Sequence, residues 1–195
     1  MTTDLRFLGI AGSLRAASYN RAALRAAGEL VPAGVTLTTY ELDHIPPYND
    51  DLWPDAPQPV QDLKAAVRAA DAIVFATPEY NYSIPGVLKN AIDWASRPYG
   101  DNAWKNKPVA VLGVSGGAVG TARAQYHLRQ CFVFLEMPAL NQPELLINFA
   151  DKKFDAQRHL TDEPTRQRIA AMLQALADWT RRLSPASHPE TAIAR

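Results

Sequence analysis

The fold is decided by the stretch Leu5-Arg6-Phe7-Leu8-Gly9-Ile10-Ala11-Gly12-Ser13. Its first seven residues form a short apolar run that is typical of a buried strand, and the run ends at Gly12 and Ser13. Helix signals follow at once, because Ser18 is a suitable N-cap and apolar residues then recur at helical spacing until Pro32. The stretch therefore predicts a buried strand that leads directly into a helix.

The same pairing of an apolar run with a helical pattern recurs along the chain. Further strands are predicted at residues 36–40, 72–77 and 108–114, with a weaker one between 138 and 147. Further helices are predicted from Pro59, from Pro85, over 121–134 and over 162–183, the last with Thr161 as its cap. This alternation predicts an α/β fold, a doubly wound five-stranded parallel sheet with helices on both faces. We expect one domain over residues 1–183 and a flexible C-terminal tail over 184–195.

Composition excludes several classes of protein. The 195 residues are 47% hydrophobic, which is too many for a disordered chain, and 20 Lys and Arg balance 20 Asp and Glu. We therefore expect no nucleic-acid partner and no membrane partner. The single cysteine, Cys131, has apolar neighbours that predict a buried thiol, and the four histidines lack metal-ligand spacing, so no metal site is expected. The start of the chain lacks the pattern of a signal peptide, and we expect a cytoplasmic protein.

Three unusual loops follow the predicted first, third and fourth strands, and the strand order 2-1-3-4-5 brings them together at one edge of the sheet. The first loop, residues 12–20, reads GSLRAASYN and offers hydroxyls, a guanidinium and the start of a helix. Free N–H groups, the positive helix end and Arg15 together favour a phosphate. Because the motifs for a nucleoside triphosphate or a dinucleotide are missing, a single terminal phosphate fits best. The alternative is a serine-rich turn that only caps a helix.

The second loop, residues 77–86, reads TPEYNYSIPG and is stiffened by two prolines. Such a turn presents backbone groups edge-on to a planar heterocycle while an aromatic ring covers one face. The alternative is a proline-rich surface turn. Taken with the first loop, this segment predicts a site for a phosphorylated flat heterocycle, and FMN meets that description.

The third loop, Gly113-Val114-Ser115-Gly116-Gly117, has two interpretations. It matches the Gly-x-Ser-x-Gly elbow of a serine hydrolase, with Asp151 or Asp155 and then His159 or His188 further along the chain. Against a hydrolase, the chain is short and the first two loops would have no task. The other interpretation is a turn of small residues that lets a flat ligand lie against the backbone.

Taken together, these stretches resemble the NADPH-dependent FMN reductase family, the flavodoxin-like group that includes quinone, chromate and azo-dye reductases. The resemblance rests on GSLR at 12–15 with Ser18 and Asn20, on PEYNYSIPG at 78–86 with LKNAIDW at 88–94, and on AQYHLR within 120–130. The matches run in order from about residue 5 to residue 144. The resemblance implies a flavodoxin-like fold.

The resemblance also implies the site and the reaction. The FMN phosphate would be held by the first loop, and the isoalloxazine and ribityl chain would be lined by the other two. The residues implied to bind the cofactor are Ser13, Arg15, Ser18, Tyr19, Asn20, Pro78, Glu79, Tyr80, Asn81, Ser115 and Gly116. NADPH or NADH would give hydride to flavin N5 and leave before a quinone or similar small electron acceptor binds, in a ping-pong cycle with no catalytic side chain. A homodimer or homotetramer is also implied, with the third helix and the Tyr82 region near the partner.

A flavodoxin-like electron carrier remains an alternative, since it would hold FMN but react poorly with NAD(P)H. The neutral charge of this chain counts against a carrier, whose partner surface is usually strongly acidic. For the carboxylate of Glu79 we expect a backbone or ribityl contact, because an anion is poorly suited to stabilise a negatively charged reduced flavin.

Overall fold

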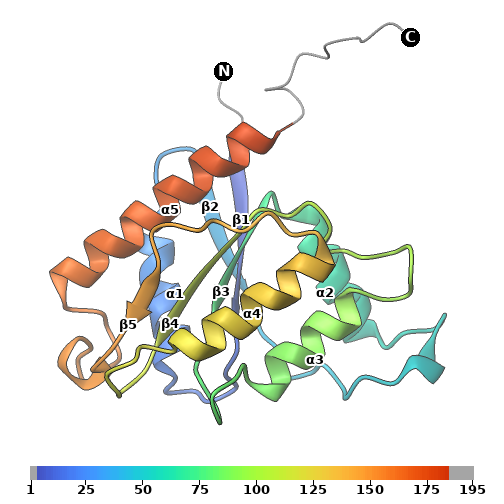
Figure 1. The fold of residues 1–195 in the computed structure, drawn as a ribbon, viewed down its shortest axis with the longest axis horizontal. Coiled ribbons are helices and arrows are strands. Elements are labelled where there is room, and N and C mark those ends of the chain that lie inside the picture. The colour runs from blue at the N-terminus through green and yellow to red at the C-terminus, as the bar shows by residue number, and fades with distance from the viewer. Residues whose placement is uncertain (1–3, 185–195) are drawn as a thin grey trace, which may run out of the picture.

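In the computed structural model, which describes residues 4–184, five parallel strands form one sheet in the order β2-β1-β3-β4-β5 (Figure 1). The strands are β1 (Leu5–Ala11), β2 (Val35–Tyr40), β3 (Ala72–Ala76), β4 (Val109–Val114) and β5 (Leu145–Ile147). This is the flavodoxin-like order predicted from the sequence. The edge strand β5 is the shortest, with three residues.

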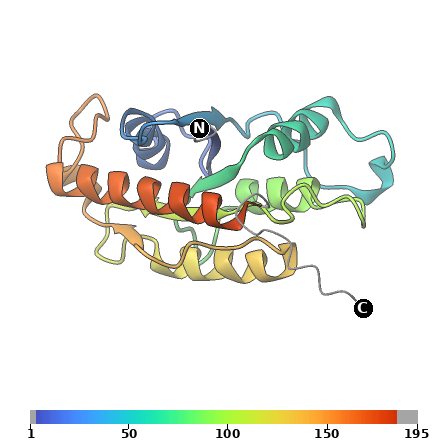
Figure 2. The same ribbon diagram turned by 90° about the horizontal axis from the view of Figure 1, so that it is seen from above.

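Helices cover both faces of the sheet, as predicted. They are α1 (Tyr19–Glu29), α2 (Gln58–Ala69), α3 (Gly86–Ala95), α4 (Ala122–Leu135) and α5 (Glu163–Leu183), with short 3-10 turns at Asp50–Leu52 and Ala150–Lys152. Helices α1 and α5 share one apolar core with the sheet, and α2, α3 and α4 share another on the opposite face. Figure 2 shows these helices on the two sides of the sheet.

The central strands explain why the apolar runs were such clear signals. All five residues of β3 and all six of β4 are buried, because helices cover the sheet on both faces. In β1, successive residues alternate between the two cores: Phe7 faces α1 and α5, whereas Leu8 and Ile10 face α2 and α3. A parallel sheet buried in this way requires continuous rather than alternating apolar sequence.

Two details at the C-terminal end differ from the sequence prediction. The N-cap of α5 is Asp162, whose carboxylate accepts from the Thr165 N–H at 2.9 Å, and not Thr161. The Thr161 hydroxyl instead donates to the Lys153 carbonyl at 3.2 Å, so it is not available to the helix. Of the predicted tail, only Ser184 is among the described residues; 185–195 lie outside them, and the tail and the domain limits stay predictions.

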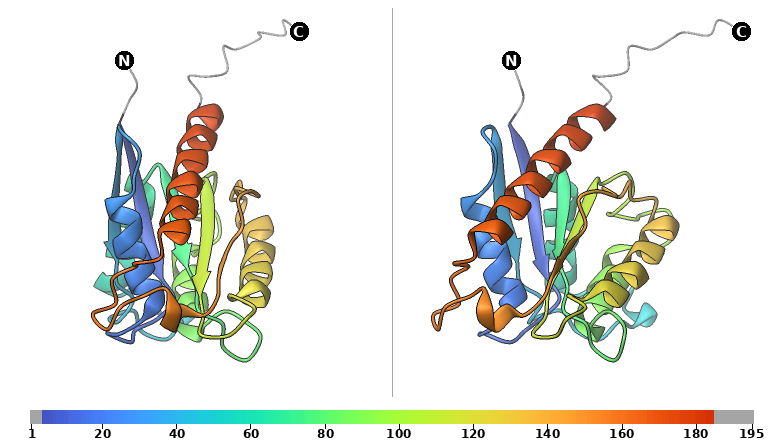
Figure 3. Two further views of the ribbon diagram at one scale, coloured as in Figure 1. Left: turned by 90° about the vertical axis from the view of Figure 1, so that its left-hand side faces the viewer. Right: turned by 60° about the vertical axis from the view of Figure 1, so that its left-hand side comes forward.

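All five strands end at the same edge of the sheet, where the loops that follow them gather (Figure 3). Backbone hydrogen bonds connect neighbouring loops and strand ends there. The Gly12 N–H donates to the Ala76 carbonyl at 2.9 Å, and the Ser115 N–H donates to the Ile147 carbonyl at 3.0 Å. The sheet thus positions the three unusual loops beside one another.

Candidate functional site

The loop between β1 and α1 has the features of an anion site. Residues 14–17 are exposed, and among the described residues the backbone N–H groups of Leu14, Ala16 and Ala17 have no hydrogen-bond partner. The guanidinium of Arg15 likewise has no partner within residues 4–184. Unpaired donors and a free cation at the positive end of α1 fit a phosphate group.

The two serines of this loop are buried and shape it. The Ser18 Oγ caps α1 by accepting from the N–H groups of Asn20 at 3.2 Å and Arg21 at 3.4 Å. The Ser13 Oγ accepts from the Arg15 N–H at 3.4 Å. Each hydroxyl keeps its own proton for a further acceptor, so both serines remain suitable donors to an anion.

Asn20 has a structural task that the sequence did not reveal. Its side-chain Nδ2 donates to the Val114 carbonyl at 3.0 Å, while its Oδ1 accepts from the Val114 N–H at 2.9 Å. The side chain is buried, and the pair connects the start of α1 to the end of β4. Asn20 therefore joins the first loop to the third.

Tyr19 packs beneath a segment from the C-terminal part of the chain. Its ring lies 5.2 Å from that of Phe154, the Arg158 guanidinium lies 4.2 Å from its centroid, and Arg158 donates to its hydroxyl. Sequence reasoning missed Arg158, which is 139 residues away and lies outside any recognisable motif.

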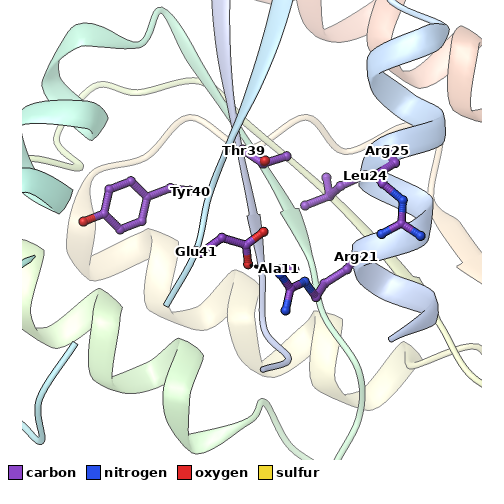
Figure 4. A pocket seen from close by; sticks show the side chains of 7 residues that line it. All are labelled: Ala11, Arg21, Leu24, Arg25, Thr39, Tyr40 and Glu41. Carbon is purple, nitrogen blue, oxygen red and sulfur yellow. Dashed lines mark ion pairs between the residues drawn. The ribbon is translucent and has the colours of Figure 1, made fainter. Parts of the chain in front are cut away.

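A pocket of about 220 Å³ adjoins the first loop on its β2 side (Figure 4). Its lining residues are Ala11, Arg21, Leu24, Arg25, Thr39, Tyr40 and Glu41. Arg21 forms an ion pair with Glu41, with an N–O distance of 2.9 Å, and donates to the Leu14 carbonyl at 3.4 Å. Arg21 thus connects the loop between β1 and α1 to the end of β2.

The loop after β3 contains a tight turn. Tyr80 and Ser83 exchange two backbone hydrogen bonds, of 3.0 and 2.9 Å, and the two residues between them have positive φ angles, 50° at Asn81 and 65° at Tyr82. This is the form of a type I′ turn, in which the second central position is usually glycine. Tyr80, Asn81 and Tyr82 are exposed, whereas Pro78 is buried below them.

Glu79 directs its carboxylate away from the turn and toward α4. Its Oε2 accepts from the backbone N–H groups of Arg123 at 3.0 Å and Ala124 at 3.2 Å, and its Oε1 forms an ion pair with the Arg123 guanidinium. Thr121, the residue before the helix, has a φ of 68° and makes no side-chain cap, so Glu79 supplies that cap from another loop. The backbone contact expected for Glu79 is therefore present, with α4 as its partner.

In the loop after β4, glycine is required at one position. A Cβ at Gly113 would lie 1.7 Å from the Thr121 Oγ1 and 2.7 Å from the Thr77 carbonyl oxygen. Close packing thus accounts for the first glycine of the hydrolase-like pattern. Gly116 is exposed, and the Ser115 hydroxyl donates to the Gly117 carbonyl at 3.2 Å.

The partners that a hydrolase needs are not assembled around Ser115. His159 pairs with Asp155, with a nitrogen–oxygen distance of 3.0 Å, and His127 contacts the Ser83 hydroxyl. Within residues 4–184 no histidine is hydrogen-bonded to Ser115, and His188 lies outside the described residues. The geometry favours the interpretation of this loop as a turn of small residues.

Cys131 is only half-buried, which corrects the expectation of a core thiol. Phe132 is buried, but Val133 and Phe134 point outward, because neighbours along a helix cannot all face the core. Burial still raises the pKa of the Cys131 thiol.

Across residues 4–184, no group of three or more histidine, cysteine or acidic residues is arranged to hold a metal ion. Of the helices in that same range, none is both long and apolar enough to cross a membrane.

The fold and the three loops together define a flavodoxin-like flavoprotein. The donors around residues 13–18 fit a single phosphate, and the exposed turn residues 80–82 and the exposed glycines Gly116 and Gly117 lie at the same edge of the sheet.

Comparison with known proteins shows which family this is. Residues 5–152 match the model of the NADPH-dependent FMN reductase family, and the chain belongs to that family. It is 53% identical over 184 residues to an NAD(P)H-dependent FMN reductase of Pseudomonas aeruginosa, covering 94% of this chain and 99% of that protein. It is 43% identical over 173 residues to a quinone reductase of Pseudomonas putida, covering 88% and 92%.

A solved structure gives the same result. The flavoenzyme FerB of Paracoccus denitrificans, an NAD(P)H:(acceptor) oxidoreductase, superimposes with a TM-score of 0.85 at 38% identity. The match covers 91% of this chain and 98% of FerB. The family membership and the fold expected from the sequence motifs are both confirmed.

Proposed function

We propose that this protein is an FMN-dependent NAD(P)H oxidoreductase that reduces quinones or similar small electron acceptors. The observation that carries the proposal is the convergence, at one edge of the sheet, of an anion-binding loop, a rigid turn and a turn of small residues. The similarity to FMN and quinone reductases supports the same reaction class. Bound FMN supplies the redox chemistry, which is hydride acceptance and donation at its N5 atom.

The first loop would hold the FMN phosphate. Arg15 would give a charge-assisted pair, Ser13 and Ser18 would donate their hydroxyl protons, and the free N–H groups of Leu14, Ala16 and Ala17 would complete the cradle. Asn20 and Tyr19, which the motif also implied, would act beneath the phosphate by fixing the loop against Val114 and Phe154.

The other two loops would hold the ring system. Pro78, Tyr80 and Asn81 would line the isoalloxazine through their backbone, and Ser115 and Gly116 would flank the ring and the ribityl chain. Glu79 would not contact the flavin with its carboxylate, since that group is engaged with α4. No side chain need act as acid or base, so the protein contributes orientation and backbone donors. The donor and the acceptor would use the same exposed face in turn, which predicts ping-pong kinetics.

The decisive experiment is the visible spectrum of the protein reconstituted with FMN and desalted, followed by anaerobic addition of NADPH and then of a quinone. We expect flavin bands that bleach with NADPH and return with quinone. Retained bands that respond to neither NADPH nor NADH would overturn the proposal in favour of an electron carrier. The absence of both retained flavin and flavin-dependent NADPH oxidation would overturn it altogether.

We further propose a cytoplasmic homo-oligomer, a dimer or tetramer. Helix α4 exposes Tyr126, Val133 and Phe134, the last two by 82% and 71%, which is unusual for large apolar side chains. A second copy of this chain would cover them. The family resemblance places the third helix and the Tyr82 region near a partner, and the Tyr82 ring contacts Arg123 of α4. A single cysteine suits a reducing compartment.

A further inference from the structure

The turn at Tyr80–Ser83 is strained, and its neighbours hold it in place. Tyr82 has a φ of 65°, a conformation that a residue with a bulky side chain rarely adopts. The residue is 66% exposed, so burial in a core does not explain the conformation. Strain of this kind persists only where surrounding contacts over-determine the backbone, and it concentrates at functional sites.

The contacts that restrain the turn come from α4. The Arg123 guanidinium lies 3.7 Å from the centroid of the Tyr82 ring, a cation–π arrangement, and Arg123 is itself held by Glu79. One turn further along the helix, the His127 Nδ1 lies 3.0 Å from the Ser83 hydroxyl oxygen. One face of α4 therefore contacts the turn at Tyr82 and Ser83, and it also contacts Glu79, the residue before the turn.

Several contacts fix the positions of the Glu79 and Arg123 side chains. The Glu79 side chain is only 8% exposed and has three partners, namely two backbone N–H groups and the guanidinium. Arg123 uses one end of its guanidinium for Glu79 and its flat face for Tyr82. Such a planar group can do both at once, which the ammonium of a lysine cannot.

We propose that Glu79 and Arg123 are positioning residues that hold the Tyr80–Ser83 turn in its strained conformation before flavin binds. The inference rests on the proposed function, in which this turn lines the flavin ring. A turn that is already ordered costs no conformational entropy when the cofactor binds, so preorganisation strengthens binding without any contact between Arg123 and the cofactor.

The test uses two readouts on the full chain, neither of which requires turnover. Amide hydrogen exchange at Tyr80 and Ser83 is followed by NMR in the FMN-free protein, and the FMN dissociation constant is measured by quenching of flavin fluorescence. The variants are Arg123→Met, which removes the cation, and Tyr82→Leu, which removes the ring but keeps the strain. Lys105→Met is the matched control, because it breaks the exposed Lys105–Glu136 pair at the other end of α4.

We expect Arg123→Met and Tyr82→Leu to leave the turn mostly open in the FMN-free protein, so that both amides lose their protection and FMN binds about five- to thirtyfold more weakly. Lys105→Met should change neither quantity. Glycine adopts a positive φ without strain, so Tyr82→Gly added to Arg123→Met should bring exchange and affinity back toward the wild-type values. This rescue separates a positioning role from a general loss of stability.

Unchanged exchange in a folded Arg123→Met protein would overturn the proposal, and so would complete loss of protection at both amides with unaltered FMN affinity. If Arg123→Met does not fold, Tyr82→Leu alone tests the proposal, because the Tyr82 side chain is exposed and the folded core does not depend on it. A wild-type protein that binds FMN but passes no electrons would instead overturn the proposed function, and it would leave the positioning role standing.

Discussion

The side-chain amide of Asn20 pairs with both backbone groups of Val114, so that one residue at the start of α1 completes the hydrogen bonding at the end of β4. A motif-based assignment made Asn20 a phosphate ligand, but this geometry gives it a role in assembling the site. The distinction can be tested through stability.

Asn20→Ala should lower the free energy of unfolding by about 2–4 kcal/mol, because it leaves a buried N–H and a buried carbonyl of Val114 without partners. Urea unfolding of the FMN-free protein measures this change. Asn148→Ala is the control, since that amide makes a more exposed hydrogen bond to the Ala118 carbonyl. A loss of FMN affinity with no loss of stability would restore Asn20 to the role of a phosphate ligand.

Arg15→Ala should weaken FMN binding by about 1.5–3 kcal/mol, the value of a hydrogen bond to a charged group. The loss should shrink as salt is added, because the contact is exposed and electrostatic. Fluorescence titration at two salt concentrations measures both effects. Arg25→Ala, an exposed arginine two turns into α1, is the control and should leave affinity within about twofold. Equal effects of the two substitutions would show that general charge, and not a phosphate contact, is responsible.

Ser115→Ala should retain NADPH oxidation within a few-fold, since the hydroxyl donates only to the nearby Gly117 carbonyl. The wild-type protein should also fail to react with a fluorophosphonate probe, because a serine without a neighbouring base is a weak nucleophile. Labelling at Ser115, or complete loss of activity in the variant, would revive the hydrolase interpretation. Mass spectrometry of the intact protein detects the label directly.

Asp162 makes the stability of α5 dependent on pH. Hydrogen bonds from Thr165 hold the pKa of this carboxyl below its usual range. Because the pKa is lower in the folded state, the Asp162 carboxylate stabilises the folded protein above its unfolded-state pKa, near 3.9. This stabilisation is lost as the pH falls through the folded-state pKa. Asp162→Ala should therefore cost about 1 kcal/mol at pH 7. The difference from wild type should vanish in acid, as followed by thermal unfolding between pH 2 and 7, and a constant difference would contradict this origin.

Phe134→Glu tests the proposed assembly. Placing a charge beside the exposed Val133 should favour the monomer, because an interface would have to bury that charge without a partner. Light scattering after size-exclusion chromatography measures the mass of each species. Glu163→Lys, a charge change on the exposed start of α5, is the control. A wild-type protein that is monomeric at micromolar concentration would contradict the oligomer.

The parts of the structure that depend on continuous burial were predictable from sequence. Strand β1 begins and ends at the predicted residues, Leu5 and Ala11, because a strand covered on both faces must be apolar throughout. The convergence of three loops followed from the strand order alone. Cap residues were less certain: Thr161 and Asp162 are both good caps, and a contact with Lys153 decided between them.

The partners within the site could not be predicted, because they lie far apart in sequence. Glu79 and Arg123 are 44 residues apart, and Asn20 and Val114 are separated by 94. The sequence around Thr121 does not indicate that this residue has a positive φ angle and makes no side-chain cap. It therefore could not show that Glu79 caps α4 instead. Arg21 and Glu41 are both ordinary surface residues until α1 and β2 are placed side by side.

The shortness of β5 has a consequence for how the protein responds to its ligand. Only three residues pair this edge strand with β4, yet the Ser115 N–H donates to Ile147 and the Ala150 N–H donates to the Ser115 carbonyl. Detachment of β5 would therefore free the loop after β4, and a ligand that orders this loop must also suppress that opening. The hydrogen-exchange protection of β5 thereby becomes a thermodynamic reporter of site occupancy that can be read without any flavin signal.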